Sequence, residues 1–83
     1  MKNKYYIAKR YYSNEEEYVE QYWDGSGFSI YEDAAIKYVN VNAVSDIAHM
    51  LKAIANIQEE VNVKYVIYAL VNGTSLKCME VIE

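Results

Sequence analysis

The amino-acid sequence predicts an α+β fold, in which an antiparallel sheet of about five strands packs against one main helix, with a short extra helix. Three observations favour it: strand-forming segments near both ends of the chain, a long segment of helical periodicity from Ser45, and an Asn72-Gly73 turn between two apolar runs. The 83 residues suffice for one hydrophobic core and not for two. We therefore expect a single domain spanning residues 1–83.

The first two strands are expected to form an N-terminal hairpin. Lys4–Tyr12 is rich in tyrosine and is followed by Ser13-Asn14, which favours a bend. Tyr18–Trp23 is aromatic and β-branched, and Asp24–Gly27 ends it with residues that tolerate positive φ. The hairpin therefore carries an acidic loop between its strands.

The middle of the chain predicts a short helix and then a third strand. Ser29 and Glu32 have the spacing of a capping box, in which the hydroxyl and the carboxylate satisfy free amides at a helix start. This predicts a short helix over residues 31–35. The following run, Ile36–Val41, partly alternates between apolar and polar residues and is interpreted as the middle strand.

The most regular pattern in the chain is that of the main helix. Its buried face steps by three and four residues through Val44, Ile47, Ala48, Leu51, Ile54, Ala55 and Gln58. Either Asn42 or Ser45 can cap its start, and Asp46 suits the positive end of the helix dipole. The buried stripe is expected to be widened by Met50, Ile54, Ile57 and Val61.

The last third of the chain predicts a second hairpin, Val63–Val71 and Thr74–Ile82, joined by Asn72-Gly73 in a type I′ turn. The expected register pairs Val71 with Thr74, Ala69 with Leu76, Ile67 with Cys78 and Val63 with Ile82. The other face would carry Leu70, Tyr68, Val66, Met79 and Val81. That face is too apolar for water alone, so the N-terminal hairpin, a homodimer partner or a target protein is expected to cover it.

The net charge of −4 is unevenly distributed along the chain. Basic residues gather at the start, at Lys2, Lys4, Lys9 and Arg10. From Tyr11 to Ile36 there is no Lys or Arg, and the acidic residues there are Glu15, Glu16, Glu17, Glu20, Asp24, Glu32 and Asp33. Because neutralising phosphates requires Lys and Arg, this segment argues against direct nucleic-acid binding. The alternative is a solvated face that only keeps the protein soluble.

The residue types needed for catalysis or metal binding are scarce. The chain has one His, one Cys, no Gly-rich phosphate loop and no spaced metal-ligand set, so we expect no enzyme, no cofactor and no metal. By helical geometry His49 points to solvent, and Cys78 is interpreted as a small buried apolar residue. A lone cysteine, without a signal peptide or an apolar span, predicts a cytoplasmic protein with no membrane partner.

Aromatic residues and carboxylates share one stretch, which suits docking into a basic groove. Enzymes that act on nucleic acids have such a groove, and the carboxylates of an acidic protein can occupy the positions that nucleic-acid phosphates would take in it. Aromatic anchors would then supply affinity. The expected contact surface consists of Tyr11, Tyr12, Glu15, Glu16, Glu17, Tyr18, Glu20, Tyr22, Trp23 and Asp24.

The segment Gly27–Val39, followed by the helix from Ser45, resembles a layout of small bacteriophage and prophage proteins, many anti-CRISPR proteins among them. The resemblance implies a phage-type inhibitor that binds a host protein, namely a nucleic-acid enzyme of a defence system, in the host cytoplasm. It carries no residue role over to this chain. The alternatives are a protein that sequesters a nucleotide-type messenger by stacking its base on Tyr or Trp, a homo-oligomeric structural or regulatory module, or a small acidic antitoxin.

Overall fold

The computed structural model describes residues 3–81. Its elements, in chain order, are β1 (Lys4–Tyr12), β2 (Tyr18–Trp23), β3 (Phe28–Ser29), a 3-10 helix η1 (Glu32–Ala34), α1 (Val41–Ile57), β4 (Val63–Val71) and β5 (Thr74–Val81). Among the described residues, no helix has the length and apolar content needed to cross a membrane.

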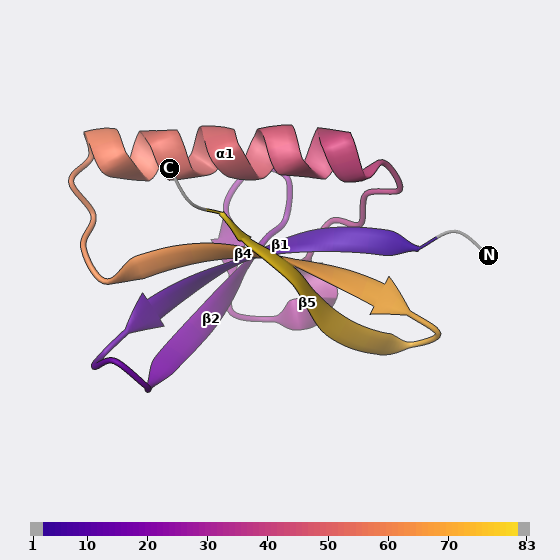
Figure 1. Cartoon of the computed structure of the whole chain (residues 1–83), viewed down its shortest axis with the longest axis horizontal. Helices are drawn as coiled ribbons and strands as arrows, with labels where there is room; N and C mark the ends of the chain where they lie inside the picture. The colour runs from indigo at the N-terminus through magenta and orange to yellow at the C-terminus, as the bar shows by residue number, and fades with distance from the viewer. Residues whose placement is uncertain (1–2, 82–83) are drawn as a thin grey trace.

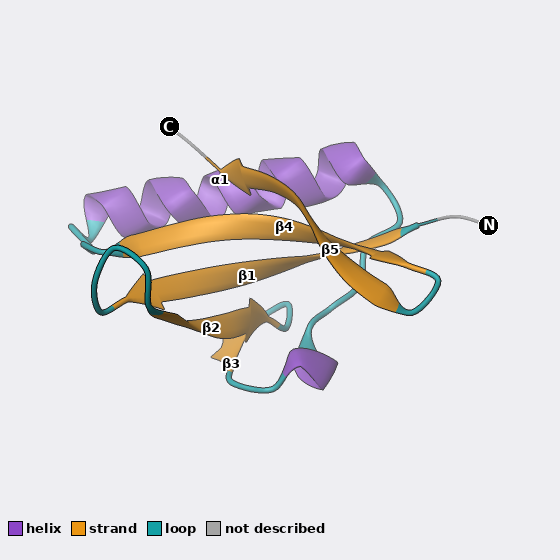
Figure 2. Ribbon diagram, turned by 60° about the horizontal axis from the view of Figure 1, so that its bottom comes forward, coloured by secondary structure: helices purple, strands orange, loops and turns teal. Residues whose placement is uncertain are grey.

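The strands form one antiparallel sheet in the order β3-β2-β1-β4-β5. α1 lies across one side of this sheet and packs on β4, β1 and β5 (Figures 1 and 2). We call this side the helix side and the opposite side the open side. The α+β class, with one main helix and a short extra helical turn, is confirmed.

The core lies between α1 and the two central strands. The buried stripe of the helix consists of Val44, Ala48, Leu51 and Ala55. It packs on Ile7 of β1 and on Tyr65 and Ile67 of β4. Because strand side chains alternate, the odd-numbered residues of these two strands face the helix and the even-numbered ones face the open side.

The N-terminal hairpin has the predicted strand bounds. β1 and β2 pair from Ala8 with Tyr22 to Tyr12 with Tyr18. The Asp24–Gly27 turn is also present: the backbone amide of Asp24 donates to the carbonyl of Gly27 at 3.0 Å, and Gly25 has a φ of 102°. Local residue preferences were sufficient here because both strands and both turns are consecutive in the chain.

The predicted middle strand, Ile36–Val41, is wrong. This segment makes a single bridge, in which Tyr38 and Tyr5 exchange backbone hydrogen bonds of 2.7 Å. Asn40 then caps α1, so the chain turns into a helix where a ladder would have continued. The strand that completes the sheet is β3, whose two residues pair with Tyr22 and Trp23.

The predicted capping box is also wrong. Ser29 lies in β3, and its Oγ accepts a hydrogen bond from the Tyr31 amide at 3.1 Å. The carboxylate of Glu32 accepts a hydrogen bond from the Tyr6 hydroxyl at 2.9 Å, far away in the sequence. The extra helix is therefore a single 3-10 turn, and its N-cap residue, Tyr31, makes no side-chain capping bond.

α1 begins four residues earlier than Ser45. Asn40 Oδ1 accepts from the amides of Asn42 at 2.8 Å and Ala43 at 3.1 Å, so the cap is Asn40 and not Asn42 or Ser45. Gln58, expected on the buried face, is the exposed C-cap residue. The expected widening is wrong as well, because the side chains concerned are exposed: Met50, Ile54, Ile57 and Val61.

The C-terminal hairpin has the predicted Asn72-Gly73 turn, and both turn residues have positive φ, at 51° and 81°. Val71 pairs with Thr74 and Ala69 with Leu76, as predicted. A register shift between Ile67 and Tyr68 then moves every later pair.

Because of this shift, Ile67 pairs with Met79 and not with Cys78. Met79 and Val81 therefore pack with the core on the helix side, and not on the opposite face as expected. The predicted pairing of Val63 with Ile82 lies outside the described residues. The side chain of Cys78 lies outside them too.

Candidate protein-binding surface

The predicted contact residues all lie on the β1–β2 hairpin and the turn after it, but the sheet divides them. Tyr11 and Trp23 belong to the helix side. Tyr12, Tyr18, Glu20 and Tyr22 belong to the open side. The other four lie in turns: Glu15, Glu16 and Glu17 between β1 and β2, and Asp24 after β2.

The loop between β1 and β2 holds its carboxylates outward. Asn14 Oδ1 accepts from the amides of Glu16 and Glu17, both at 2.8 Å, and the Ser13 amide donates to the Glu17 carbonyl at 2.9 Å. These bonds occupy the backbone and not the carboxylates, although Asn14 Nδ2 also donates to Glu17 at 2.9 Å. The exposed side chains of Glu15, Glu16 and Glu17 thus gather at one tip.

Glu20 is engaged inside the molecule. Its Oε2 accepts from Arg10 Nε at 2.9 Å and from the Tyr68 hydroxyl, and its Oε1 accepts from the Tyr22 hydroxyl at 3.3 Å. Arg10 Nη2 also donates to the Tyr68 hydroxyl at 2.9 Å. Glu20 therefore stabilises the open side of the sheet, and little of its charge reaches a partner.

Three tyrosines of the open side, Tyr6, Tyr22 and Tyr68, have raised pKa values. Burial, and then the hydrogen bond to Glu20, raise the pKa of Tyr68 to about 12. Burial, and then the charges of Glu20 and Glu32, raise the pKa of Tyr22 to about 12. Tyr6 stacks on Tyr68 with ring centroids 5.2 Å apart, and its pKa is also raised, chiefly by burial. Tyrosine side chains of the sheet itself therefore cover much of the open side. The sequence predicted that this face would be covered by the N-terminal hairpin, a homodimer partner or a target protein.

Trp23 and Asp24 have structural contacts of their own. The Trp23 ring lies 5.3 Å from that of Phe28 and packs against the core. Asp24 Oδ1 accepts from the amides of Ser26 at 2.9 Å and Gly27 at 2.8 Å, and these bonds lower the pKa of Asp24. The predicted residues that remain most available to a partner are Tyr11, Glu15, Glu16, Glu17 and Tyr18.

The structure adds residues that sequence reasoning missed. The Tyr12 amide donates to the Asn62 carbonyl at 2.8 Å, which joins the chain between α1 and β4 to the end of the hairpin. The loop between α1 and β4 therefore lies at the same end of the molecule as the β1–β2 loop (Figure 1), and the end of α1 and this loop carry the exposed residues Ile57, Glu59 and Val61. The two consecutive acidic residues Glu59 and Glu60 are visible in the sequence. No local sequence pattern, however, predicts that the C-terminal end of the helix lies next to the β1–β2 loop.

An ion pair between Lys9 of β1 and Glu60 holds the segment between α1 and β4 against the sheet. The Lys9 side chain is on the helix side, and the residue is only 5% exposed. Its Nζ lies 2.7 Å from Oε2 and 3.1 Å from Oε1 of Glu60, and 4.8 Å from the centre of the Tyr11 ring. Burial alone would lower the pKa of Lys9, but hydrogen bonds to Glu60 and Tyr11 outweigh it and raise the pKa. Lys9 is therefore a charged, internally paired residue.

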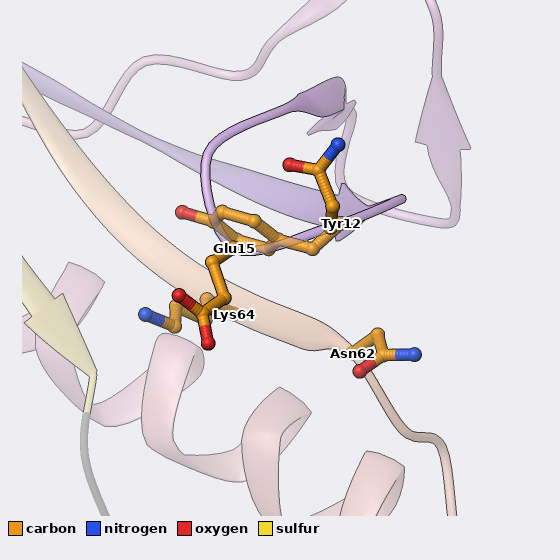
Figure 3. A pocket seen from close by; sticks show the side chains of 5 residues that line it. Tyr12, Glu15, Asn62 and Lys64 are labelled. Carbon is orange, nitrogen blue, oxygen red and sulfur yellow. The ribbon is translucent and has the colours of Figure 1, made fainter.

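A hollow of about 380 Å³ opens beside the loop on the open side (Figure 3). It is lined by Tyr12, Asn14, Glu15, Asn62 and Lys64. Lys64 Nζ lies 5.1 Å from the centre of the Tyr12 ring. The hollow thus combines an aromatic ring with two amides, one carboxylate and one ammonium group.

Chemistry-bearing groups are sparse on this surface. Within residues 3–81 no three His, Cys, Asp or Glu residues are placed to hold a metal ion. His49, expected in solvent, is half-buried, with Nδ1 2.8 Å from the Ser45 carbonyl oxygen of its own helix. The surface offers charge and aromatic area, which are means of binding.

No family model, no curated protein and no solved structure matches this chain.

Proposed function

We propose that this chain is a phage-type inhibitor that binds a host nucleic-acid enzyme of a defence system and occupies its basic groove. One observation carries the proposal: Glu15, Glu16 and Glu17 are exposed together at the hairpin tip, and the partly exposed residues Tyr11 and Tyr18 flank this tip on opposite sides of the sheet. Concentrated charge beside aromatic anchors suits a protein partner that is itself basic.

The two kinds of residue have separate roles in this proposal. The carboxylates steer the encounter with a positive groove and raise the association rate, an effect that salt screens. The aromatic rings supply buried area once the two proteins touch and so slow dissociation. Carboxylates in the groove exclude nucleic acid, because both compete for the same Lys and Arg side chains.

The test begins with capture of tagged protein from a bacterial host lysate, washed at low and at high salt and identified by mass spectrometry. The captured enzyme is then titrated with its own nucleic acid in the presence and absence of this protein. We expect competition that weakens as salt rises. Capture that yields no nucleic-acid enzyme, or an enzyme that binds both at once, would overturn the proposal.

A matched pair of variants isolates the loop. Glu16→Lys and Asp33→Lys change the net charge equally, and both side chains are exposed, but Asp33 lies in η1. We expect Glu16→Lys to slow association with the captured enzyme severalfold and Asp33→Lys to have a much smaller effect. Equal effects would mean that overall charge, and not this loop, attracts the partner.

A small-ligand function is the second candidate, favoured by the hollow in which Lys64 and the Tyr12 ring lie together. Two nearby cations are engaged elsewhere, Lys9 with Glu60 and Arg10 with Glu20, and Lys64 is the lysine that lines the hollow. A single lysine is a poor match for a nucleotide's phosphates. A rise in melting temperature with nucleotides, lost in Lys64→Ala, would favour this candidate.

A further inference from the structure

Six exposed apolar side chains lie on the β1–β2 hairpin, on α1 and on the loop that follows α1. We call this group the apolar ridge, and it consists of Tyr11 (36% exposed), Val19 (67%), Val61 (76%), Ile57 (81%), Ile54 (44%) and Met50 (51%). Together these make far more exposed apolar surface than one scattered side chain would.

Strand pairing and helix spacing join the members of the ridge. Val19 lies opposite Tyr11 across β1 and β2, and Tyr11 lies opposite Val63, two residues after Val61. Along α1, Ile57, Ile54 and Met50 are separated by three and four residues and so follow one another on one side of the helix. The ridge therefore runs from the hairpin along the flank of α1.

The architecture explains why this surface is left uncovered. α1 packs on β4, β1 and β5, while β2 and β3 lie toward the other edge of the sheet (Figure 2). A helix about 10 Å wide covers only about two to three strands spaced about 4.8 Å apart, and not all five. The stripe through Val44, Ala48, Leu51 and Ala55 already fills the contact with the sheet. The flank of α1 that carries Met50, Ile54 and Ile57 therefore stays exposed.

The charges around the ridge define the chemistry of its occupant. Exposed carboxylates border it, from Glu15, Glu16, Glu17, Asp46 and Glu59. The cation beside Tyr11 is Lys9, which is buried and paired with Glu60. Lys52 follows Met50 by two residues and so lies on the opposite flank of α1, while Lys64 lines the hollow on the open side. The border is acidic.

We propose that the apolar ridge docks a basic amphipathic helix of a partner protein, laid beside α1, with its apolar stripe on the ridge and its Lys and Arg side chains on the bordering carboxylates. The spacing of Met50, Ile54 and Ile57 within α1, in steps of four and three, is the spacing that a facing helix interdigitates with, and Val61 extends the exposed apolar surface just past the end of α1. The inference rests on the proposed function in one respect, that the helix belongs to the inhibited enzyme.

A second copy of this chain fits the ridge less well. A twofold pair would place the same acidic border against itself, and each copy carries a net charge of −4. Like charges at the border of an interface oppose its formation. We therefore expect the isolated protein to be monomeric in sedimentation at low salt.

The experiment uses a synthetic helical peptide with Leu at the heptad a and d positions and Lys or Arg at the flanking positions. Its binding is followed by backbone amide NMR shifts of the labelled protein. A second peptide keeps the same Leu positions and carries Glu at the flanks. We expect the basic peptide to bind, with its largest shifts at the ridge residues, and the acidic peptide to bind at least about tenfold more weakly.

Variants make the test specific. The double substitution Ile54→Ser and Ile57→Ser should reduce the affinity for the basic peptide by about tenfold or more, because two exposed side chains lose their apolar contact with it. Leu76→Ser, on β5 and also exposed, is the matched control and should leave the affinity unchanged. Both sites are on the surface, and circular dichroism verifies that the variants fold. Shifts centred away from the ridge, or equal losses in both variants, would overturn the inference, as would a dimer that closes over the ridge.

The failure of this inference and that of the proposed function are distinguishable. If Ile54→Ser with Ile57→Ser still captures the nucleic-acid enzyme while Glu16→Lys does not, the acidic loop acts alone and the ridge proposal is wrong. If the ridge binds the basic peptide but no nucleic-acid enzyme is captured, the ridge stands and the proposed function falls.

Discussion

Lys9 and Arg10 are neighbours in β1, yet they bury their charges on opposite sides of the sheet and in different ways. Lys9 on the helix side depends on Glu60, 51 residues away, and is otherwise surrounded by the rings of Tyr11, Phe28 and Tyr65. Arg10 on the open side pairs with Glu20, its direct neighbour across the strands. One pair ties distant parts of the fold together, and the other reinforces a hairpin.

The two pairs also differ in what would remain if the acid were lost. Arg10 keeps the hydroxyl oxygens of Tyr68 at 2.9 Å and Tyr12 at 3.4 Å as acceptors. Lys9 would keep the hydroxyl groups of Tyr11 and Tyr65, but its side chain is more deeply buried, at 7% exposed against 11% for Arg10. Removing the carboxylate partner should therefore lower the free energy of unfolding more on the helix side, where Lys9 remains, than on the open side, where Arg10 remains.

Glu60→Ala is expected to have the largest effect. It leaves Lys9 buried and without its carboxylate, so the free energy of unfolding should fall by about 3 kcal/mol. Urea unfolding followed by circular dichroism measures it, and Glu59→Ala, the exposed neighbour, should cost less than about 0.5 kcal/mol. Combining Glu60→Ala with Lys9→Met should recover part of the loss. No recovery would show that Glu60 contributes more through packing than through charge.

Glu20→Ala should cost less, about 2 kcal/mol, because Arg10 is less deeply buried than Lys9 and retains two tyrosine hydroxyls as acceptors. The same urea experiment measures it, with the exposed Glu17→Ala as the control. If Glu20→Ala proved as costly as Glu60→Ala, the hydroxyl oxygens would not be substituting for the carboxylate and the contrast between the two sides would fail.

Alkaline pH tests the open side through its tyrosines. The pKa of Tyr68 is raised from 10.0 to about 12 on folding, so the unfolded chain loses this proton first as pH rises. The stability from Tyr68 is therefore complete below pH 10 and is lost between pH 10 and 12. Tyr68→Phe removes this loss, and its free energy of unfolding should decline less steeply over that range. An unchanged slope would contradict a buried, protonated Tyr68.

The smallest effect on stability is expected in the acidic loop. Glu16→Lys alters an exposed side chain. The contact of Glu16 with Asn14 is made by its backbone amide and not by its carboxylate. The free energy of unfolding should change by less than about 0.5 kcal/mol. Thermal melting measures this, and a larger loss would mean that the loop serves the fold and not a partner.

Sequence reasoning identified the hairpin that carries the candidate surface but not how its residues divide. An acidic and aromatic pattern locates the contact region, and two-residue alternation could have separated Tyr11 from Tyr12. It could not show that Arg10 and Tyr68 would engage Glu20, since Tyr68 belongs to a strand 48 residues away. Nor could it bring Ile57, Glu59 and Val61 to the same end.

The sequence by itself determined both hairpins, their turns and the existence of α1, because each depends on residues close together in the chain: strand formers beside turn formers, and a stripe of period 3.6. Only the tertiary structure decided the rest. Tyr38 bridges Tyr5 and ends a segment that alternation alone would make a strand, and the register shift beside Ile67 places Met79 and Val81 against α1. The helix face that looked wide enough for the core is half uncovered, because a single helix cannot span a five-stranded sheet.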